Sequence, residues 1–386
     1  MRVVILGSTG SIGVQALDVV SRLGGSVAAL TADRNVRLLE EQVRAFSVPL
    51  CALADEAAAA DLRVRLADTP AKVLSGPEGV ACCARTADPD PADPLRVLNS
   101  IVGVAGLSPT LAALETGHTV ALANKESLVA GGELVVRAAA EHGASLLPVD
   151  SEHSAIFQAL QGCPDLRSLR GVILTASGGP FFGKSRAELA DVTISQALAH
   201  PTWSMGAKIT VDSATMMNKG LELMEAAWLF GLPPERIDVV VHRQSIVHSL
   251  IEYHDGAVLA QLGLPDMRVP IQYALTYPQR LPSPAGRLNL AEWGTLTFEA
   301  PDEDAFPAPA LCREALRRGG VVPAAVNAAN EEANALFRAG KLRFPQITEA
   351  VACALDAAPA APADSLGAVL SAGEWARELV RAHYVR

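Results

Sequence analysis

A glycine-rich stretch directly after the first apolar run constrains the fold of this chain more than any other feature. Val3–Leu6 predicts a short buried strand, Gly7, Gly10 and Gly13 follow at equal intervals, and Ile12–Leu23 has helical spacing. Gly7 permits a sharp turn, Gly10 lets a pyrophosphate approach a helix N-terminus, and Gly13 permits close packing of helix on strand. The stretch therefore predicts a dinucleotide-binding turn. Because the spacing is GxxGxxG rather than GxGxxG, a plain glycine turn in a doubly wound fold is the alternative.

Strands and helices alternate through the first 149 residues, which predicts a parallel sheet with right-handed crossovers. Further strands are predicted at Ser26–Leu30, Arg96–Asn99, Thr119–Leu122 and Ala144–Val149, and further helices at Leu38–Phe46 and Leu128–His142.

From Asp150 the pattern changes to strands and hairpins around single helices. Strands are predicted at Gly171–Thr175, Lys208–Val211, Arg236–Val241, Ser245–Tyr253 and Ala257–Leu262, with a tight turn at His254–Gly256 and a helix at Gly220–Phe230. A proline-rich stretch follows, and then helices at Ala310–Leu316, Ala324–Arg338, Pro345–Leu355 and Ser365–Ala382. We predict an α/β protein with an N-terminal Rossmann-like parallel sheet (1–149), a central α+β catalytic domain (150–277), a linker (278–303) and a C-terminal helical domain (304–386).

Composition excludes several classes of protein. Half of the residues are apolar and 19% are charged, which excludes a disordered chain. The net charge of −10 argues against a general nucleic-acid binder. No apolar run reaches the length of about 18 residues that a membrane span needs. Six scattered cysteines without a CxxC pair predict a reduced protein of the cytoplasm.

The end of the second predicted strand bears on cofactor choice. An acidic residue there would bond the 2′-hydroxyl of NAD, whereas an arginine would pair with the 2′-phosphate of NADP. The sequence has both, as Asp33 and Arg34, followed by Asn35. The residues leave the choice open, although Arg34 and Asn35 favour NADP.

Carboxylates gather at a second strand end. Asp150 and Glu152 would point to one side of an extended chain, and Glu222 is the candidate third ligand. Three carboxylates form an oxygen site suited to Mg²⁺ or Mn²⁺. The alternative is a helix-capping Asp with a solvated Glu.

Hydroxyl, amide and ammonium groups in the central segment suit a phosphate monoester. Ser177 and Ser213 are placed at predicted strand ends, and Asn218 and Lys219 follow the second of these. Lys219 could equally be a solvated lysine. In the helical segment Asn327, Asn330, Glu331 and Asn334 form a polar stripe to which we assign no chemistry.

The loop His200–Gly206 carries Trp203 and Met205 between a predicted helix and a predicted strand. Such a loop resembles a lid that excludes water from a ligand. A tryptophan-anchored loop packed on the core is the alternative.

Together these segments resemble the 1-deoxy-D-xylulose 5-phosphate reductoisomerase family. The matching stretches, in chain order, are GSTGSIG, ALANKESLV, LPVDSEHSAIFQ, TASGGPF, ALAHPTWSMGAKITVDSATMMNKGLE, VLAQLGLPDMRVPIQYAL and VNAANEEAN. They run from residue 7 to about residue 334, and the long HPTWSMG to NKGLE stretch is the most specific.

The resemblance implies residue roles. The residues implied in NADPH binding are Thr9, Gly10, Ser11, Ile12, Arg34, Asn35, Asn124, Glu126 and Gly206. Those implied as ligands of one divalent cation (Mg²⁺, Mn²⁺ or Co²⁺) are Asp150, Glu152 and Glu222. Substrate binding is implied for Lys125, Ser151, Glu152, Ser177, His200, Trp203, Ser213, Asn218, Lys219 and Glu222. The implied catalytic residues are Lys125, Asp150, Glu152 and Glu222.

The resemblance also implies an activity. A metal-bound ketose phosphate, 1-deoxy-D-xylulose 5-phosphate, would be rearranged and reduced to 2-C-methyl-D-erythritol 4-phosphate in the non-mevalonate route to isoprenoid precursors, by a homodimer. Asp33 departs from the family, which usually has a small residue there. A metal-independent Rossmann oxidoreductase, such as a semialdehyde or homoserine dehydrogenase, and a non-catalytic nucleotide sensor are the alternatives.

Overall fold

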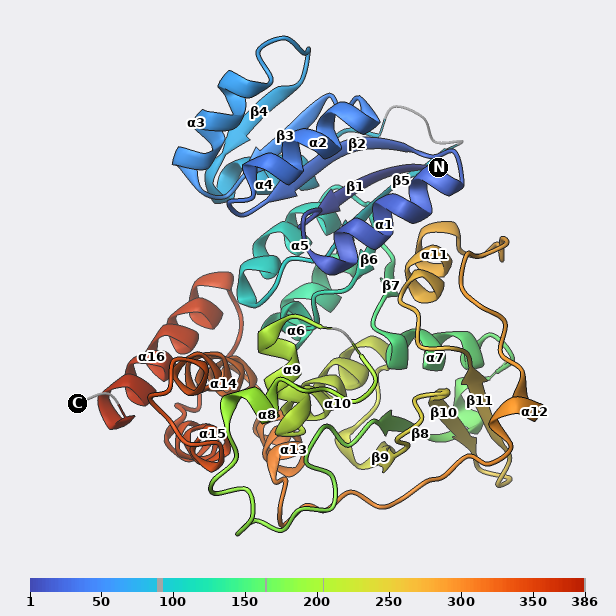
Figure 1. Cartoon of the computed structure of the whole chain (residues 1–386), viewed down its shortest axis with the longest axis vertical. Helices are drawn as coiled ribbons and strands as arrows, with labels where there is room; N and C mark the ends of the chain where they lie inside the picture. The colour runs from blue at the N-terminus through green and yellow to red at the C-terminus, as the bar shows by residue number, and fades with distance from the viewer. Residues whose placement is uncertain (89–92, 164, 204, 385–386) are drawn as a thin grey trace. The chain divides into compact units, whose positions relative to one another are not determined.

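The chain forms two compact units in the computed structural model, which describes residues 1–386 except 89–92, 164, 204 and 385–386 (Figure 1). The first unit consists of Met1–Ser127, Val135–Ser154 and Asp266–Ala285. The second consists of Leu128–Leu134, Ala155–Pro265 and Gly286–Arg386. Helices α6 (Lys125–Glu141) and α7 (Ser151–Leu160) contribute residues to both units.

The first unit is built on a seven-stranded parallel sheet of order β4-β3-β2-β1-β5-β6-β7. Its strands are β1 (Arg2–Leu6), β2 (Ser26–Ala32), β3 (Leu50–Leu53), β4 (Lys72–Ser75), β5 (Leu95–Asn99), β6 (Thr119–Leu122) and β7 (Leu146–Pro148). The central strands are nearly continuous apolar runs because helices cover both faces of a parallel sheet. Val3, Val4, Ile5 and Leu6 of β1 are fully buried. The predicted Rossmann-like sheet is confirmed.

The helices of this unit are α1 (Ser11–Arg22), α2 (Val36–Phe46), α3 (Glu56–Arg65), α4 (Gly76–Ala84), α5 (Leu107–Leu114), most of α6, and α11 (Arg268–Thr276). Three of them begin where an Asx side chain accepts a hydrogen bond from the first turn: Asn35 caps α2, Asp55 caps α3 and Asn124 caps α6. Such a cap satisfies a backbone N–H that has no partner within the helix. Two or three residues, the last of them the cap, separate each of these helices from the preceding strand.

The second unit contains a four-stranded mixed sheet of order β11-β10-β8-β9. Its strands are β8 (Leu169–Ala176), β9 (Ile237–Val241), β10 (Val247–Tyr253) and β11 (Val258–Leu262). β8 and β9 are parallel, and the other two pairings are antiparallel. Gly256 has a φ of +87° in the turn between β10 and β11, as a tight hairpin requires. The predicted hairpin and α+β character are confirmed.

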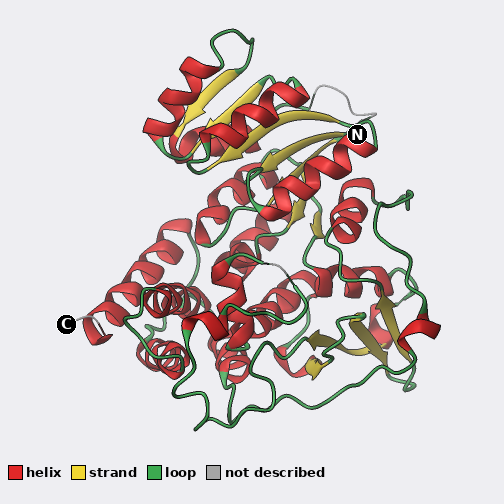
Figure 2. Ribbon diagram, viewed as in Figure 1, coloured by secondary structure: helices red, strands yellow, loops and turns green. Residues whose placement is uncertain are grey.

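The remaining helices of the second unit are joined by loops (Figure 2). They are most of α7, then α8 (Ile194–Ala197), α9 (Ala207–Ala214), α10 (Met217–Phe230), α12 (Leu290–Trp293), α13 (Ala308–Arg318), α14 (Val322–Arg338), α15 (Pro345–Ala357) and α16 (Leu366–Tyr384). The predicted C-terminal helices are confirmed as α13 to α16. None of the described helices is both long and apolar enough to cross a membrane.

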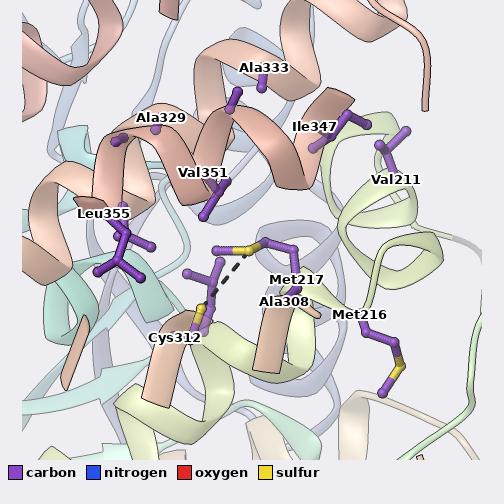
Figure 3. Close-up of a cluster of buried hydrophobic side chains, with 14 of the residues drawn as sticks. Val211, Met216, Met217, Ala308, Cys312, Ala329, Ala333, Ile347, Val351 and Leu355 are labelled. Carbon is purple, nitrogen blue, oxygen red and sulfur yellow. Dashed lines mark hydrogen bonds between the residues drawn. The ribbon is translucent and has the colours of Figure 1, made fainter. Parts of the chain in front are cut away.

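Small and sulfur-containing side chains let the helices of the second unit pack closely. The sulfur atoms of Met217 on α10 and Cys312 on α13 lie 3.9 Å apart, near Val351 and Leu355 of α15 (Figure 3). A Cβ on Gly220 would lie 2.6 Å from the Cys312 sulfur, so α10 can approach α13 this closely only with glycine at that position. Burial in this core raises the pKa of the Cys312 thiol, which stays protonated.

Two local predictions are wrong. Lys208–Val211 is not a strand but part of helix α9. The β-branched run Ile209–Val211 favours a strand locally, but Thr210, Val211 and Ala214 are buried at helical spacing, and packing overrides propensity. Asp150 to Glu152 is not extended either, because α7 begins at Ser151.

Candidate active site

The glycine turn lies at the carboxyl edge of the seven-stranded sheet. Gly7 has a φ of +82°, and its N–H donates to the Thr31 carbonyl and hydroxyl oxygens of β2, both at 3.1 Å. A Cβ on Gly13 would lie 2.4 Å from the Gly7 carbonyl oxygen, so only glycine lets α1 begin so close to the turn. Gly10 is the N-cap of α1. The first backbone N–H groups of a helix have no intrahelical acceptors and attract anions.

A buried glutamine, Gln42, holds this turn in place. Its role was not predicted from the sequence. The Ser8 hydroxyl donates to Gln42 Oε1 at 2.7 Å, and Gln42 Nε2 donates to the Ser8 carbonyl oxygen at 3.0 Å. Gln42 lies on α2, 34 residues away. A polar residue on the buried face of an amphipathic helix was the only available signal.

Asn124 and Glu126 are placed at the carboxyl end of β6 and are both buried. The Asn124 side-chain amide donates to the carbonyl oxygens of Ile101 and Gly103 at 2.6 and 2.9 Å, and to Glu126 Oε2 at 3.1 Å. Its Oδ1 accepts from Ser127 N. Asn124 thus holds the loop after β5 against the start of α6.

Lys125 and Asp150 form an ion pair in the first unit, with Nζ and Oδ2 2.7 Å apart and both side chains largely buried. Burial alone would raise the Asp150 pKa, but the charges of Lys125 and His153 and the hydrogen bonds from Lys125 and Glu152 outweigh it, so the pKa lies well below its ordinary value. Because its pKa is low, Asp150 is ionised at neutral pH. In the first turn of α7, Ser151 Oγ donates to Glu152 Oε2 at 2.5 Å.

Glu222, the third predicted metal ligand, lies on α10 in the second unit. Its side chain is 1% exposed; Asn218 Nδ2 donates to Oε1 at 2.5 Å, and Lys219 pairs with Oε2. The Lys219 side chain is 4% exposed, so it is not a solvated lysine. Spacings of three and four residues put these side chains on one face of α10. The structure thus brings together a predicted metal ligand and two predicted phosphate ligands.

Ser177 and His200 lie beyond the end of β8, where the Ser213 backbone lies close to Gly179. Gly178 and Gly179 both have positive φ, and a Cβ on Gly179 would lie 2.8 Å from the Ser213 carbonyl oxygen on α9. Ser177 Oγ and His200 Nε2 are 3.0 Å apart. The sequence analysis placed Ser213 at a strand end, but it lies in a helix.

The hydrogen bonds of His200 define its protonation. Its Nδ1 accepts from the backbone N–H of Thr202 and Trp203 at 3.1 and 2.9 Å, so the proton of the neutral ring is on Nε2, which faces Ser177. Burial lowers the pKa of His200, which favours the neutral ring.

The predicted flap lies between α8 and α9, not between a helix and a strand. Trp203 and Met205 are half-buried, and Gly206 is the exposed N-cap of α9. The Trp203 and His248 ring centroids are 6.5 Å apart. Ser204 is outside the described residues.

A buried network behind Ser213 explains the polar stripe on α14. Asp212 Oδ1 accepts from Asn330 Nδ2 at 2.9 Å and from Asn334 Nδ2 at 2.8 Å, and Oδ2 pairs with Lys208 Nζ at 3.0 Å. Asn334 also donates to the Lys208 carbonyl oxygen. The network attaches α9, which carries Ser213, to α14. Sequence reasoning found the stripe but not its partner, which lies 118 to 122 residues away.

A parallel sheet with a glycine turn of this kind at its carboxyl edge defines a dinucleotide-binding α/β protein. Comparison with known sequences identifies the family within that class. A model of 1-deoxy-D-xylulose 5-phosphate reductoisomerase matches residues 3–132, and models of the C-terminal domains of that enzyme match residues 146–230 and 262–379. The chain belongs to the 1-deoxy-D-xylulose 5-phosphate reductoisomerase family.

Individual relatives agree with this assignment. The reductoisomerase of Acetivibrio thermocellus is 50% identical over 379 residues, covering 98% of each chain, and that of Caulobacter vibrioides is 54% identical over 358 residues, covering 92% of this chain and 88% of the relative. The solved structure of the Zymomonas mobilis reductoisomerase with NADPH matches with a TM-score of 0.92 and 44% identity, over 100% of this chain and 99% of that one. A reductoisomerase structure with NADPH, fosmidomycin and magnesium also has a TM-score of 0.92, at 40% identity, over 99% of this chain and 98% of that one.

Proposed function

We propose that this chain performs the reaction of its family through the residues that the two units place at their polar sites. It is an NADPH-dependent oxidoreductase and isomerase that uses a divalent cation to convert 1-deoxy-D-xylulose 5-phosphate to 2-C-methyl-D-erythritol 4-phosphate, in the non-mevalonate route to isoprenoid precursors. The observation that carries this function is the family match, which extends over nearly the whole chain.

Asp150, Glu152 and Glu222 are the proposed ligands of the cation. Carboxylate oxygens are the donors that Mg²⁺ and Mn²⁺ prefer, and the low pKa of Asp150 keeps one of them charged at neutral pH. The residues present therefore fit a hard divalent cation. Asp150 and Glu152 belong to the first unit and Glu222 to the second.

The bound cation supplies Lewis acidity to oxygens of the ketose, and NADPH supplies hydride. Lys125 is a buried cation at the end of β6, and its Nζ can stabilise negative charge that develops on a substrate oxygen. Glu152 can exchange a proton with a substrate hydroxyl, and Ser151, hydrogen-bonded to it, orients its carboxylate.

The phosphate of the substrate is proposed to bind Ser177, His200, Ser213, Asn218 and Lys219. The neutral His200 can donate its Nε2 proton, and Lys219 supplies a buried positive charge. Held at its non-reacting end, the substrate is positioned for reaction, and Trp203 and Met205 cover it against water.

NADPH is proposed to bind at the first unit, with its pyrophosphate at the N-terminus of α1 on Thr9, Gly10, Ser11 and Ile12. Arg34 and Asn35 are proposed for the 2′-phosphate. Asn124, Glu126 and Gly206 are proposed for the nicotinamide side, the first two through the loop that Asn124 holds.

Three further properties belong to this proposal. The domain boundaries 1–149, 150–277, 278–303 and 304–386 are proposed as functional divisions. A homodimer through the central sheet is supported by β11, which pairs only with β10 among the described strands and exposes Val258 and Leu259. A cytoplasmic location is supported by six cysteines that are all free thiols.

A coupled assay tests the function. Purified protein with 1-deoxy-D-xylulose 5-phosphate, NADPH and Mg²⁺ should consume NADPH, and a chelator should stop the reaction until excess Mg²⁺ restores it. Activity that survives the chelator would favour a metal-independent dehydrogenase.

A further inference from the structure

The end of β2 carries an ion cluster that the rearrangement does not require. Arg34 Nε lies 3.1 Å from Asp55 Oδ2 and 3.9 Å from Asp33 Oδ2. Asp33 and Arg34 directly follow β2, and Asp55 follows the neighbouring strand β3. The backbone N–H of Asp55 donates to the Asp33 carbonyl oxygen at 3.1 Å. Two carboxylates therefore flank one guanidinium, and the cluster has a net charge of −1.

This cluster lies at the same edge of the sheet as the glycine turn. β1 and β2 are paired with Leu6 opposite Thr31, and Thr31 accepts the Gly7 N–H two residues before Asp33. In dinucleotide-binding sheets the adenosine ribose lies at the carboxyl end of the second strand. An acidic residue there accepts from the 2′-hydroxyl of NAD, and an arginine accommodates the 2′-phosphate of NADP.

Helix capping fixes the position of Asp55. Its Oδ1 accepts from Ala58 N at 2.9 Å as the N-cap of α3, which leaves Oδ2 for Arg34. The Asp33 and Arg34 side chains are 77% and 75% exposed, and ion pairs this exposed contribute little to folding. Asp33 is thus accessible to a ligand, and a 2′-phosphate that bound Arg34 would share its guanidinium with Asp55.

We propose that Asp33 and Asp55 relax the cofactor preference of this chain, so that it binds NADH as well as NADPH. Asp33 accepts a hydrogen bond from the ribose 2′-hydroxyl of NADH. Both carboxylates repel the 2′-phosphate of NADPH, which carries nearly two negative charges at neutral pH, and Asp55 competes with it for Arg34. This proposal rests on the proposed dinucleotide site and concerns which of the two cofactors that site binds.

Binding of each cofactor to the protein without substrate tests this proposal independently of turnover. The dissociation constants of NADPH and NADH are measured by calorimetry for the wild type, Asp33→Asn and Asp55→Asn. Asparagine removes the charge while keeping the shape, and it caps a helix as well as aspartate does. Asp61→Asn is the matched control, because Asp61 is on the exposed face of the same helix and pairs with Arg65 at 3.0 Å.

We expect the wild type to bind NADH within about tenfold of NADPH. Asp33→Asn should tighten NADPH about five- to tenfold and weaken NADH severalfold, whereas Asp55→Asn should tighten NADPH by a smaller factor and leave NADH unchanged. Asp61→Asn should change neither. The gain in NADPH affinity should shrink as salt is raised, because exposed charges are screened.

Different failures are distinguishable. A wild type that binds NADH more than about a thousandfold more weakly than NADPH overturns the relaxed preference but leaves the NADPH site intact. An Asp33→Asn variant that shifts both affinities equally also overturns it. A protein that binds neither cofactor contradicts the proposed dinucleotide site itself.

Discussion

The glycine turn of the first unit and the polar cluster on α9 and α10 of the second unit are built in different ways. The turn is formed mainly by backbone geometry, because Gly7 and Gly13 let a helix begin close to the sheet edge. The nearby charged side chains of Asp33 and Arg34 are exposed. The cluster on α10 is formed instead by charged side chains, and Lys219 and Glu222 are almost fully buried.

Because of this difference, the two regions should respond differently to amino-acid substitutions. A backbone site fails when a Cβ is added, whereas the loss of an exposed charge changes its affinity for a charged ligand only moderately. A buried ionic site fails when one charge is removed, because its partner is left without compensation in a poorly solvated place. Substitutions should therefore separate the two regions cleanly.

The largest expected effect is that of Glu222→Gln. Removal of a buried carboxylate from the proposed cation site should lower kcat/KM at least about a hundredfold and weaken metal binding. The affinity for NADPH should stay within about twofold, because the glycine turn is in the other unit. Steady-state kinetics and calorimetry measure both. The control is Glu235→Gln, an exposed residue paired with Arg317; unchanged turnover in Glu222→Gln would remove this residue from the site.

Gly13→Ala tests the opposite region. The new Cβ would lie 2.4 Å from the Gly7 carbonyl oxygen, so the backbone must shift at a cost of about 1–3 kcal/mol, and NADPH affinity should fall by roughly tenfold or more. Titration of NADPH and thermal unfolding measure the two effects. In Gly367→Ala, the control, the added Cβ meets no atom within 4 Å. Full NADPH affinity in Gly13→Ala would contradict the role of the turn.

Asn334→Ala should have a smaller effect on the side-chain-built region. It removes the hydrogen bonds to Asp212 and to the Lys208 carbonyl oxygen, so the free energy of unfolding should fall by about 1–2 kcal/mol. Because α9 carries Ser213, the substrate KM should rise severalfold with little change in kcat. Asn327→Ala on the same helix removes one bond to Glu331 and is the control. Equal effects of the two substitutions would show that the network does not position α9.

The smallest effect concerns the pH dependence through His200. Burial puts its folded pKa below the ordinary value of 6.5, so the unfolded chain binds a proton more readily. The contribution of the neutral ring to stability is present above the unfolded pKa and is lost as pH falls through the folded pKa. Urea unfolding measures the free energy of unfolding at about pH 7 and about pH 5. Between these pH values it should fall more for the wild type than for His200→Gln, because glutamine does not titrate. Equal losses would mean that His200 is not held neutral.

The two regions also differ in how far the sequence predicted them. The strand, the glycine turn and the following helix were predicted close to their observed bounds, since Gly7, Gly10 and Gly13 act within a few residues of one another. In the second unit the segment Lys208–Val211 was predicted as a strand, and the Asp150–Glu152 segment of the first unit was predicted as extended. The roles of the candidate site residues stay predictions, but the local geometry assumed for Asp150, Glu152 and Ser213 was wrong.

The sequence by itself determined the alternation of strands and helices, the glycine turn and the hairpin at His254–Gly256, because turn chemistry and hydrophobic periodicity act over short stretches of chain. The tertiary structure alone decided that Ile209–Val211 would be helical, that Lys219 would be buried beside Glu222, and that Asn330 and Asn334 would bind Asp212. These outcomes depend on which surfaces pack together, and Asp212 binds partners 118 and 122 residues away. Burial and the need to satisfy buried polar groups then outweigh local preference.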